Sequence, residues 1–365
     1  MTDKKKELPI TLDIEFTESM GISVPLCILS TVQGYRNWMN TNYMMPIACM
    51  KGDDMFEYVI ADGARYGWLS QMPPALMRFS FVGDNILKDV RDIIEVLVES
   101  IDMQQYCVLF LDNYYLPCEE SFQKVHYVHE VLIYGYDIGT HIFQIITYGR
   151  KIHKAEIAFN DLKNGFEAAF EYIKDTDGWD KYMLMQYSLI NHKRDYPYYK
   201  KEFLGKLRLY KEGNLPEKVY FERYLYQNYE EGDCFYGLKA NEAFLIKMKR
   251  VQEMFCEGDD ETKYDIFRHY GPIHTYAEFH KALLKRLTYY NSFCPRGIVT
   301  NKVLKKYIEI VNLIEVIRFL YIKLQIYSNQ KYNEEKIIRI LNAIIEKLEV
   351  IIFLETKVMN EILEI

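Results

Sequence analysis

The sequence predicts an α+β protein, in which a first domain with an antiparallel sheet is followed by a mostly helical region. Two runs, "QYCVLFLDNYYL" (105–116) and "HEVLIYGYDIGTHIFQIITYG" (129–149), alternate polar or aromatic residues with aliphatic ones, as half-buried antiparallel strands do. After about residue 155 the apolar residues recur almost throughout at helical spacing. We therefore divide the chain into a first domain at 1–160 and a helical, tyrosine-rich region at 161–365.

The first domain begins with an amphipathic helix predicted at about 26–39, just behind Pro25, which is a favoured residue at a helix start. The stretch 50–67 is loop-like, and "ILKDVRDIIEVLVES" (86–100) predicts a second helix. The run 129–149 divides at Gly139 into two strands of a hairpin, because glycine favours the turn between them.

The helical region starts with "NDLKNGFEAAFEYIK" (160–174), which begins at an Asn or Asp cap, and continues with a helix at 237–255. The last 65 residues predict an antiparallel pair of helices at about 300–328 and 333–364. The second of these carries an apolar seam at three- and four-residue spacing, formed by Ile337, Leu341, Ile344, Leu348 and Ile351. We favour packing of this seam within the chain over packing on a second subunit, although the oligomeric state is left open.

Composition excludes several classes of function. A net charge of −7 disfavours general nucleic-acid binding, and no run of 18 uncharged apolar residues predicts a membrane span. Seven cysteines without CxxC pairs, behind a start that lacks the apolar core of a signal peptide, favour reduced thiols in the cytoplasm. No phosphate-binding or dinucleotide fingerprint occurs, so we expect no cofactor. We also expect no metal, because His269, His274 and His280 lack a completing ligand and favour surface or turn positions.

The candidate chemistry centres on Cys27, which the predicted helix places in its first turn. Unpaired N–H groups and the helix dipole stabilise a thiolate at such a position. A thiolate nucleophile needs a base, and His129, at the start of an apolar strand, is the best candidate; His126 is the reserve. The remaining cysteines lack a neighbouring base, and Cys107 in "YCVLFL" has the pattern of a buried strand residue.

Together, Cys27, the "LFLDNYYL" strand and "HEVLIYGYD…FQIITYG" resemble the papain-like cysteine peptidase fold, and within it the family named for the N-terminal domain of butirosin biosynthesis protein H. The resemblance covers about residues 20–170. It implies that Cys27 is the nucleophile and His129 the base. Papain-like enzymes usually carry Asp or Asn in the third position, where this sequence has Thr147. Asp137 is the nearest carboxylate, but a turn role in the hairpin is favoured for it. No glutamine ahead of Cys27 matches the usual oxyanion-hole side chain.

The same resemblance implies acyl transfer from a carrier-protein thioester to an amine or diamine, as in amide synthetases of thiotemplated natural-product pathways such as polythioamide (closthioamide) biosynthesis. A thioester has a good leaving group, so Thr147 in place of a carboxylate is tolerable for this reaction. Two alternatives stay open, a cysteine hydrolase (peptidase or thioesterase) and a non-catalytic binding protein. A basic cluster could receive an acidic acyl carrier protein, although a solvated helix face is favoured. It comprises Lys200, Lys201, Lys206, Arg208 and Lys211.

Overall fold

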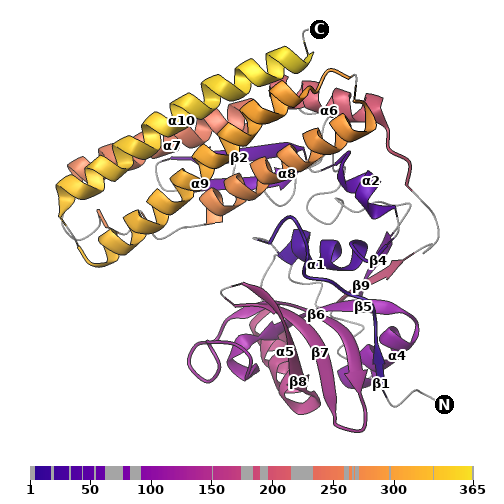
Figure 1. Ribbon diagram of the computed structural model, residues 1–365. Helices are drawn as coiled ribbons and strands as arrows, with labels where there is room; N and C mark the ends of the chain where they lie inside the picture. The colour runs from indigo at the N-terminus through magenta and orange to yellow at the C-terminus, as the bar shows by residue number, and fades with distance from the viewer. Residues whose placement is uncertain are drawn as a thin grey trace. The chain divides into compact units, whose positions relative to one another are not determined.

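The computed structural model divides the chain into two compact units that alternate along the sequence (Figure 1). Unit 1 comprises Met1–Tyr35 and Met72–Tyr196, and unit 2 comprises Arg36–Gln71 and Pro197–Ile365. The predicted boundary at residue 160 lies inside unit 1. The structure describes residues 5–17, 20–32, 34–42, 44–52, 55–61, 77–82, 92–149, 151–173, 184–189, 196–214, 233–258, 263–264, 267, 271–295, 297–331 and 333–363.

Unit 1 is built on a seven-stranded antiparallel sheet with the order β4-β9-β5-β6-β7-β8, in which β1 pairs with β6 off this path. The strands are β1 (Lys5–Glu7), β4 (Met77–Val82), β5 (Gln105–Asp112), β6 (Val128–Asp137), β7 (Ile142–Tyr148), β8 (Ile152–Ala158) and β9 (Leu184–Leu189). The predicted division of 129–149 into two strands is confirmed. The hairpin turn is capped by Asp137, whose Oδ1 accepts hydrogen bonds from Gly139 N (2.9 Å) and Thr140 N (3.2 Å).

The described helices of unit 1 are α1 (Met20–Leu29), α4 (Ile93–Asp102) and α5 (Phe159–Ile173), with a 3₁₀ turn, η2 (Asn113–Tyr115), after β5. The predicted single helix at 26–39 is wrong. The chain leaves α1 after Leu29 and passes through Gly34 at φ 83°, a left-handed conformation that suits glycine, before α2 (Tyr35–Met39). α4 begins later than predicted, at the N-cap Asp92, whose side chain accepts a hydrogen bond from Ile94 N. Residues 86–91 of the predicted helix lie outside the described part of the chain.

Unit 2 combines a three-stranded antiparallel sheet, in the order β10-β2-β3, with long helices. The strands are β2 (Met45–Lys51), β3 (Met55–Ala61) and β10 (Cys234–Tyr236), so the prediction of a loop over 50–67 is wrong for β3. The described helices beyond α2 are α6 (Lys200–Glu212), α7 (Leu238–Glu257), α8 (Gly271–Phe293), α9 (Asn301–Asn329) and α10 (Glu334–Leu363). In Figure 1, α7 to α10 flank the β2–β3 hairpin.

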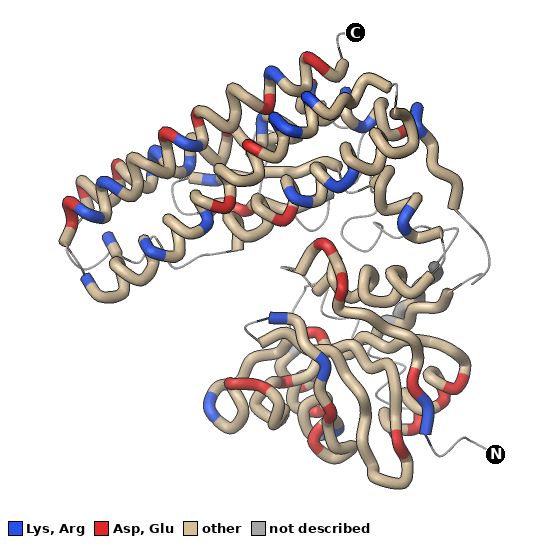
Figure 2. The backbone as a smooth tube through the Cα atoms, viewed as in Figure 1, with Lys and Arg blue, Asp and Glu red and all other residues tan. Residues whose placement is uncertain are grey.

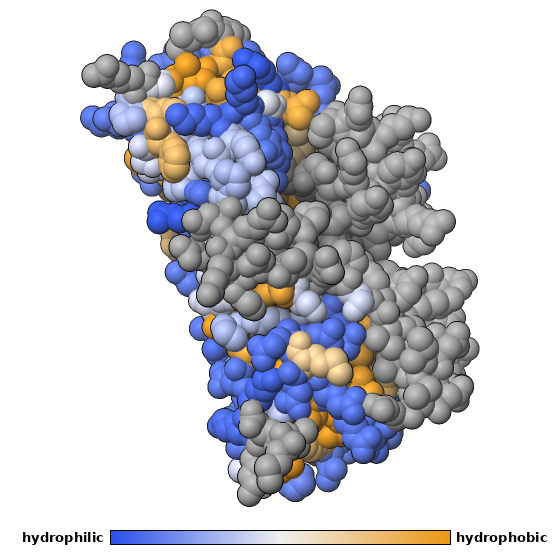
Figure 3. Space-filling view, turned by 90° about the vertical axis from the view of Figure 1, so that its right-hand side faces the viewer, coloured by the Kyte–Doolittle hydropathy of each residue, from blue (hydrophilic) through white to orange (hydrophobic). Residues whose placement is uncertain are grey.

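The apolar seam of α10 is buried within the chain, as predicted. Ile337, Leu341, Ile344, Leu348 and Ile351 are all fully buried, and α10 packs on α9 and α7. The outer surfaces of these helices carry interspersed acidic and basic residues (Figure 2), some of which pair between helices, such as Lys249 with Glu349 at 2.6 Å. Hydrophilic residues with small hydrophobic patches between them form much of the described surface in Figure 3.

Hydropathy gives one further finding about the helices. None of the described helices combines the length and the apolar character that crossing a membrane requires.

Candidate functional site

Cys27 lies inside a helix rather than at its head. α1 begins at Met20, so Cys27 is the eighth residue of ten and sits near the C-terminal end of the helix, where the dipole does not favour an anion. Its side chain is fully buried. Burial raises the pKa of the Cys27 thiol to about 12, against a smaller lowering by the charge of Lys154. The thiol is therefore protonated at neutral pH.

No contact among the described residues joins Cys27 to His129. Ile146 pairs with Leu132 on one side and with Lys154 on the other, so the side chains of these three residues share one face of the sheet. His129 pairs with Leu111, and the parity of β6 places its Cβ on the opposite face. Among the described residues no hydrogen bond, ion pair or ring contact joins the two side chains.

His129 is held instead by neighbours on the ends of β6 and β7. Its Nδ1 lies 3.2 Å from the backbone oxygen of Glu130 and 3.3 Å from Oε2 of the same residue. Its ring stacks on Tyr148 with a centroid separation of 6.2 Å and an interplanar angle of 17°. The carboxylate of the adjacent Glu130 therefore lies beside the His129 ring, and the Thr147 hydroxyl does not contact it.

Thr147 is engaged elsewhere. Its hydroxyl donates a hydrogen bond of 2.6 Å to Oε1 of Glu119, and both residues are buried. Within the described residues the Thr147 hydroxyl makes this hydrogen bond and none to His129, so it does not orient that imidazole. The structure therefore does not bring Cys27, His129 and Thr147 together as a triad.

A different histidine in unit 1 has the geometry of an oriented base. Nδ1 of His126 lies 2.6 Å from Oδ2 of Asp112, and because a carboxylate only accepts, Nδ1 carries the proton. The Asp112 side chain is 5% exposed and that of His126 is 65% exposed. The ring of Tyr114 stacks on the imidazole at 4.2 Å with an interplanar angle of 13°. In the neutral form of this imidazole, Nε2 is the nitrogen that can accept a proton, and solvent reaches the ring.

Asp112 is fixed by the backbone around it. It ends β5 and caps η2, where its Oδ1 accepts hydrogen bonds from Tyr114 N (3.0 Å) and Tyr127 N (3.1 Å). A further backbone bond from Asn113 N to Tyr127 O (2.9 Å) closes the 113–127 loop at its base. Oδ2 is left to hold His126, so the loop geometry positions the imidazole.

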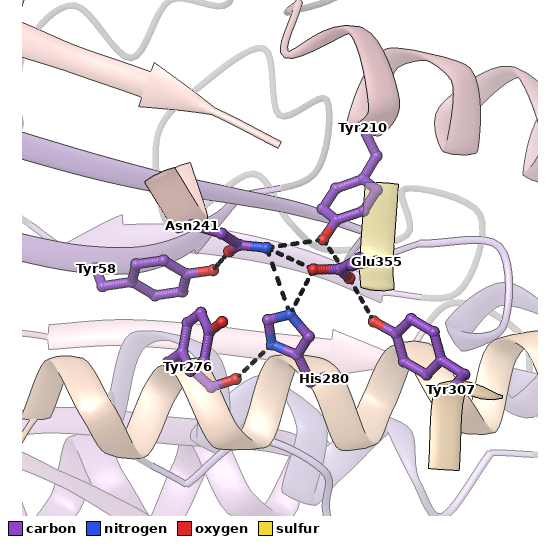
Figure 4. Close-up of polar contacts among 7 residues, drawn as sticks. All are labelled: Tyr58, Tyr210, Asn241, Tyr276, His280, Tyr307 and Glu355. Atoms are coloured by element: carbon purple, nitrogen blue, oxygen red, sulfur yellow. Dashed lines mark hydrogen bonds and ion pairs between the residues drawn. The ribbon is translucent and has the colours of Figure 1, made fainter. Parts of the chain in front are cut away.

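Unit 2 contains a second polar cluster, which we call the Glu355 cluster (Figure 4). Its members come from one strand and five helices: Tyr58 of β3, Tyr210 of α6, Asn241 of α7, Tyr276 and His280 of α8, Tyr307 of α9 and Glu355 of α10. Glu355 and His280 are both fully buried. A carboxylate at such a depth is stable only when its oxygens accept several hydrogen bonds.

Four donors surround the Glu355 carboxylate. Oε1 accepts from the hydroxyls of Tyr210 (2.7 Å) and Tyr307 (2.8 Å), while Oε2 accepts from Asn241 Nδ2 (2.8 Å) and faces His280 Nε2 (3.2 Å). Burial by itself raises the pKa of Glu355. The charge and hydrogen bond of His280, together with the tyrosine hydrogen bonds, outweigh burial and lower the pKa below its ordinary value.

The hydrogen bonds of His280 indicate its protonation. Nδ1 lies 2.9 Å from the backbone oxygen of Tyr276, an acceptor, so Nδ1 carries a proton. Nε2 lies 3.2 Å from Oε2 of Glu355 and 3.4 Å from Asn241 Nδ2, and when Nε2 is also protonated the contact with Glu355 is a buried ion pair. The one side chain of Figure 4 without a hydrogen-bond partner is Tyr276, whose buried hydroxyl is unsatisfied.

Among the predicted roles of the other histidines and cysteines, one is wrong and one is confirmed. The surface or turn role predicted for His280 is wrong; the ion pair with Glu355 explains how a histidine is buried in the interior of α8. His274 lies in α8 and pairs with Glu278 at 3.2 Å, and His269 is outside the described residues. Cys107 is a buried strand residue, as predicted.

Two further results bear on chemistry. Within the described residues there is no group of three or more His, Cys, Asp or Glu side chains that could hold a metal ion. No protein-family model matches the chain, and no curated protein matches it significantly.

The sequence did contain a signal for the His126–Asp112 pair. The "DNYY" stretch (112–115) ends a predicted strand with a carboxylate, and a strand end next to a turn is where a side chain can be fixed by backbone N–H groups. The separation of His126 from Asp112 along the chain hides their contact from a reading of the sequence.

Proposed function

We propose that unit 1 catalyses transfer of an acyl group from a thioester to an amine, with His126 as the general base and Asp112 as its positioning residue. The observation that supports this proposal is the pair itself: a buried carboxylate, fixed by two backbone N–H groups, holds Nδ1 of an exposed imidazole at 2.6 Å. This arrangement leaves Nε2 free to accept a proton. The substrate class rests on the resemblance of the sequence to the butirosin-type family.

The reaction proceeds by direct displacement. The amine nitrogen attacks the thioester carbonyl carbon while Nε2 of His126 takes a proton from that nitrogen. The C–S bond then breaks, an amide forms, and the departing thiolate takes the proton from His126. Asp112 stabilises the imidazolium between these steps, which is the role of the carboxylate in acid–base dyads.

Direct displacement is preferred to an acyl-enzyme on Cys27 because of the state of that thiol. A thiol with a pKa of about 12 and no accessible surface supplies almost no thiolate at neutral pH. A general base of the His126 kind contributes about 10²–10⁴-fold to a rate, and the good leaving group of a thioester makes that contribution sufficient.

Amide formation from a panel of aryl and alkyl acyl thioesters with a diamine tests the proposal. We expect His126→Gln to lower kcat/KM by about 10²–10⁴-fold. His129→Gln, a matched histidine of the same sheet end, and Cys27→Ser should each retain activity within about threefold, since neither group receives the proton in this reaction. Loss of activity in Cys27→Ser together with an acyl adduct on wild-type Cys27 would restore the acyl-enzyme route. Release of free acid in place of amide would indicate the hydrolase.

The donor can also be carrier-bound. The exposed basic residues Lys200, Lys201 and Arg208 lie on α6 in unit 2, whereas Lys206 is engaged with Asn42 and Glu202. Reversing the charge at Lys201 and Arg208 should slow turnover of an acyl carrier protein donor and leave a small-molecule thioester unaffected. Equal rates with the carrier-bound donor would remove α6 as the docking surface.

The second candidate function is a non-catalytic binding protein, which the buried, protonated Cys27 favours. If no thioester is consumed under any condition while acyl thioesters still bind, as measured by calorimetry, unit 1 is a binding module.

A further inference from the structure

Two cysteines of unit 2 face each other across neighbouring strands. Cys49 of β2 pairs directly with Cys234 of β10 in the antiparallel ladder, although they are 185 positions apart in the sequence. Their Sγ atoms are 2.8 Å apart, and both are free thiols. None of the other described cysteines has this arrangement.

The backbone geometry suits a covalent bond between them. Directly opposed residues of an antiparallel pair have Cα atoms about 4.5 or 5.5 Å apart, depending on the hydrogen-bonding class of the pair. Both separations lie in the range of about 4.4–6.8 Å that a disulfide spans. No strand has to move for the bond to form.

The two thiols differ in the way that a stepwise oxidation requires. Cys49 is fully buried and Cys234 is partly exposed. Either sulfur can donate in the Cys49–Cys234 contact. This contact and burial raise the pKa of Cys49, and the same contact lowers the pKa of Cys234 against its smaller desolvation. Cys234 is therefore the more acidic and more accessible thiol, so it reacts first with an oxidant, and Cys49 reacts second.

We propose that Cys49 and Cys234 form a reversible redox pair that hydroperoxides oxidise to a disulfide. The Cys234 thiolate attacks a peroxide oxygen, the O–O bond breaks and Cys234 becomes a sulfenic acid, with water or an alcohol leaving. The Cys49 sulfur then attacks the sulfenic sulfur, an S–S bond forms, the S–O bond breaks, and the hydroxyl leaves as water with the proton of the Cys49 thiol. Two thiols lose two electrons and two protons, and the peroxide takes them. A dithiol then reduces the protein disulfide to two thiols by exchange and is itself oxidised to a disulfide.

The bond fixes an edge strand. β10 has three residues and, among the described strands, pairs with β2 at the edge of the three-stranded sheet. The turn after it leads through Gly237 into α7, one of the helices of the Glu355 cluster. Oxidation therefore links the start of α7 covalently to the β2–β3 hairpin and restrains β10 against separation from the sheet.

Hydrogen peroxide treatment of the full chain, followed by alkylation under denaturing conditions and peptide mass spectrometry, tests the proposal. In wild type we expect a linked Cys49–Cys234 peptide that dithiothreitol resolves. In Cys49→Ser we expect a sulfenic acid at Cys234 that dimedone traps, because the resolving thiol is gone. Cys256→Ser, which removes an exposed cysteine of α7, should leave the linked peptide unchanged.

Three results would overturn the pair. The first is conversion of Cys234 to sulfinic acid in the wild-type protein while Cys49 remains a thiol that the later alkylation modifies. The second is a disulfide between either thiol and Cys256 in place of its cross-strand partner. The third is the linked peptide appearing only after denaturation, because the reaction would then not depend on the native register of β2 and β10.

Discussion

Replacement of Glu355 by glutamine tests how unit 2 is held together. The substitution keeps the size and shape of the side chain but removes the charge opposite His280 and turns one oxygen into a donor. Oε1 can still accept from Tyr210 and Tyr307, whereas an amide in the position of Oε2 faces the N–H groups of Asn241 and His280. Breaking a buried ion pair on one side costs about 3–5 kcal/mol, and this pair is fully buried.

Substitutions within the Glu355 cluster should lower the free energy of unfolding by different amounts. Tyr307→Phe removes one of two hydroxyl donors to Oε1, and a hydrogen bond to a charged group contributes about 1.5–3 kcal/mol. Tyr276→Phe is the matched control, since its hydroxyl is equally buried and has no partner. Removing an unsatisfied buried hydroxyl should be neutral or stabilising. The expected order of free-energy loss is Glu355→Gln, then Tyr307→Phe, then Tyr276→Phe.

Urea unfolding followed by circular dichroism measures the order. For a slope m of about 3 kcal/mol/M, Glu355→Gln should lower the midpoint by about 1–1.7 M and Tyr307→Phe by about 0.5–1 M, with m unchanged. A loss below about 1 kcal/mol for Glu355→Gln would contradict the ion pair. So would a Tyr276→Phe variant as unstable as Tyr307→Phe, since that result would assign the stability to ring packing and not to the hydrogen bonds.

Three further outcomes follow from the described contacts. The pKa of Glu355 in the folded chain is below its ordinary value of 4.5. The stability that its charge contributes is therefore present above pH 4.5 and is lost as the pH falls through the folded pKa. Unfolding titrations at several pH values should accordingly show a weaker loss of stability at acid pH in Glu355→Gln than in wild type. At pH 8, iodoacetamide should alkylate exposed Cys256 about 10³-fold faster than Cys27, whose pKa is about 12, and equal rates followed by mass spectrometry would refute the buried thiol. In thermal unfolding, Gly237→Ala should destabilise by more than about 1 kcal/mol, because φ is 58° and a Cβ would lie 2.1 Å from a carbonyl oxygen of α6. Gly205→Ala, within α6 with open space around it, should stabilise by about 0.5–1 kcal/mol; a loss at both glycines would remove the argument from backbone geometry.

Local patterns predicted the regular elements well where one periodicity extended over many residues. The helices α5, α7, α9 and α10 and the β6–β7 hairpin follow the predicted ranges closely. The errors lie where short elements depend on tertiary partners. β3 looked like a loop because its flanks are rich in Gly and Asp, yet it is stabilised by pairing with β2 and by α8. The helix predicted at 26–39 joined α1 and α2 across a glycine in the left-handed region.

The candidate site was harder to predict because its contacts join residues far apart in sequence. Periodicity identifies the face of a strand but not the loop that closes over its end, so the contact between Asp112 and His126 is invisible along the chain. The prediction about Cys27 depended on where a helix begins, and helix boundaries are the least certain feature of a sequence reading. Moving the start of α1 to Met20 places the thiol near the C-terminal end of the helix, and the expected acidity becomes its opposite.

Glu355 shows what a sequence pattern can and cannot yield at a buried position. The seam of α10 continues beyond Ile351 in the same spacing, through Glu355 to Val358 and Ile362, all of which are buried. A carboxylate at a seam position implies that donors or a cation lie opposite it, because burial without them is too costly. The pattern therefore predicts that partners exist, but the partners come from β3, α6, α7, α8 and α9, and only the packed structure selects them. An apolar residue at this position would be compatible with many helix arrangements, whereas one carboxylate that accepts from four donors is compatible with one arrangement. We infer that the cluster fixes the register of α10 against its neighbours.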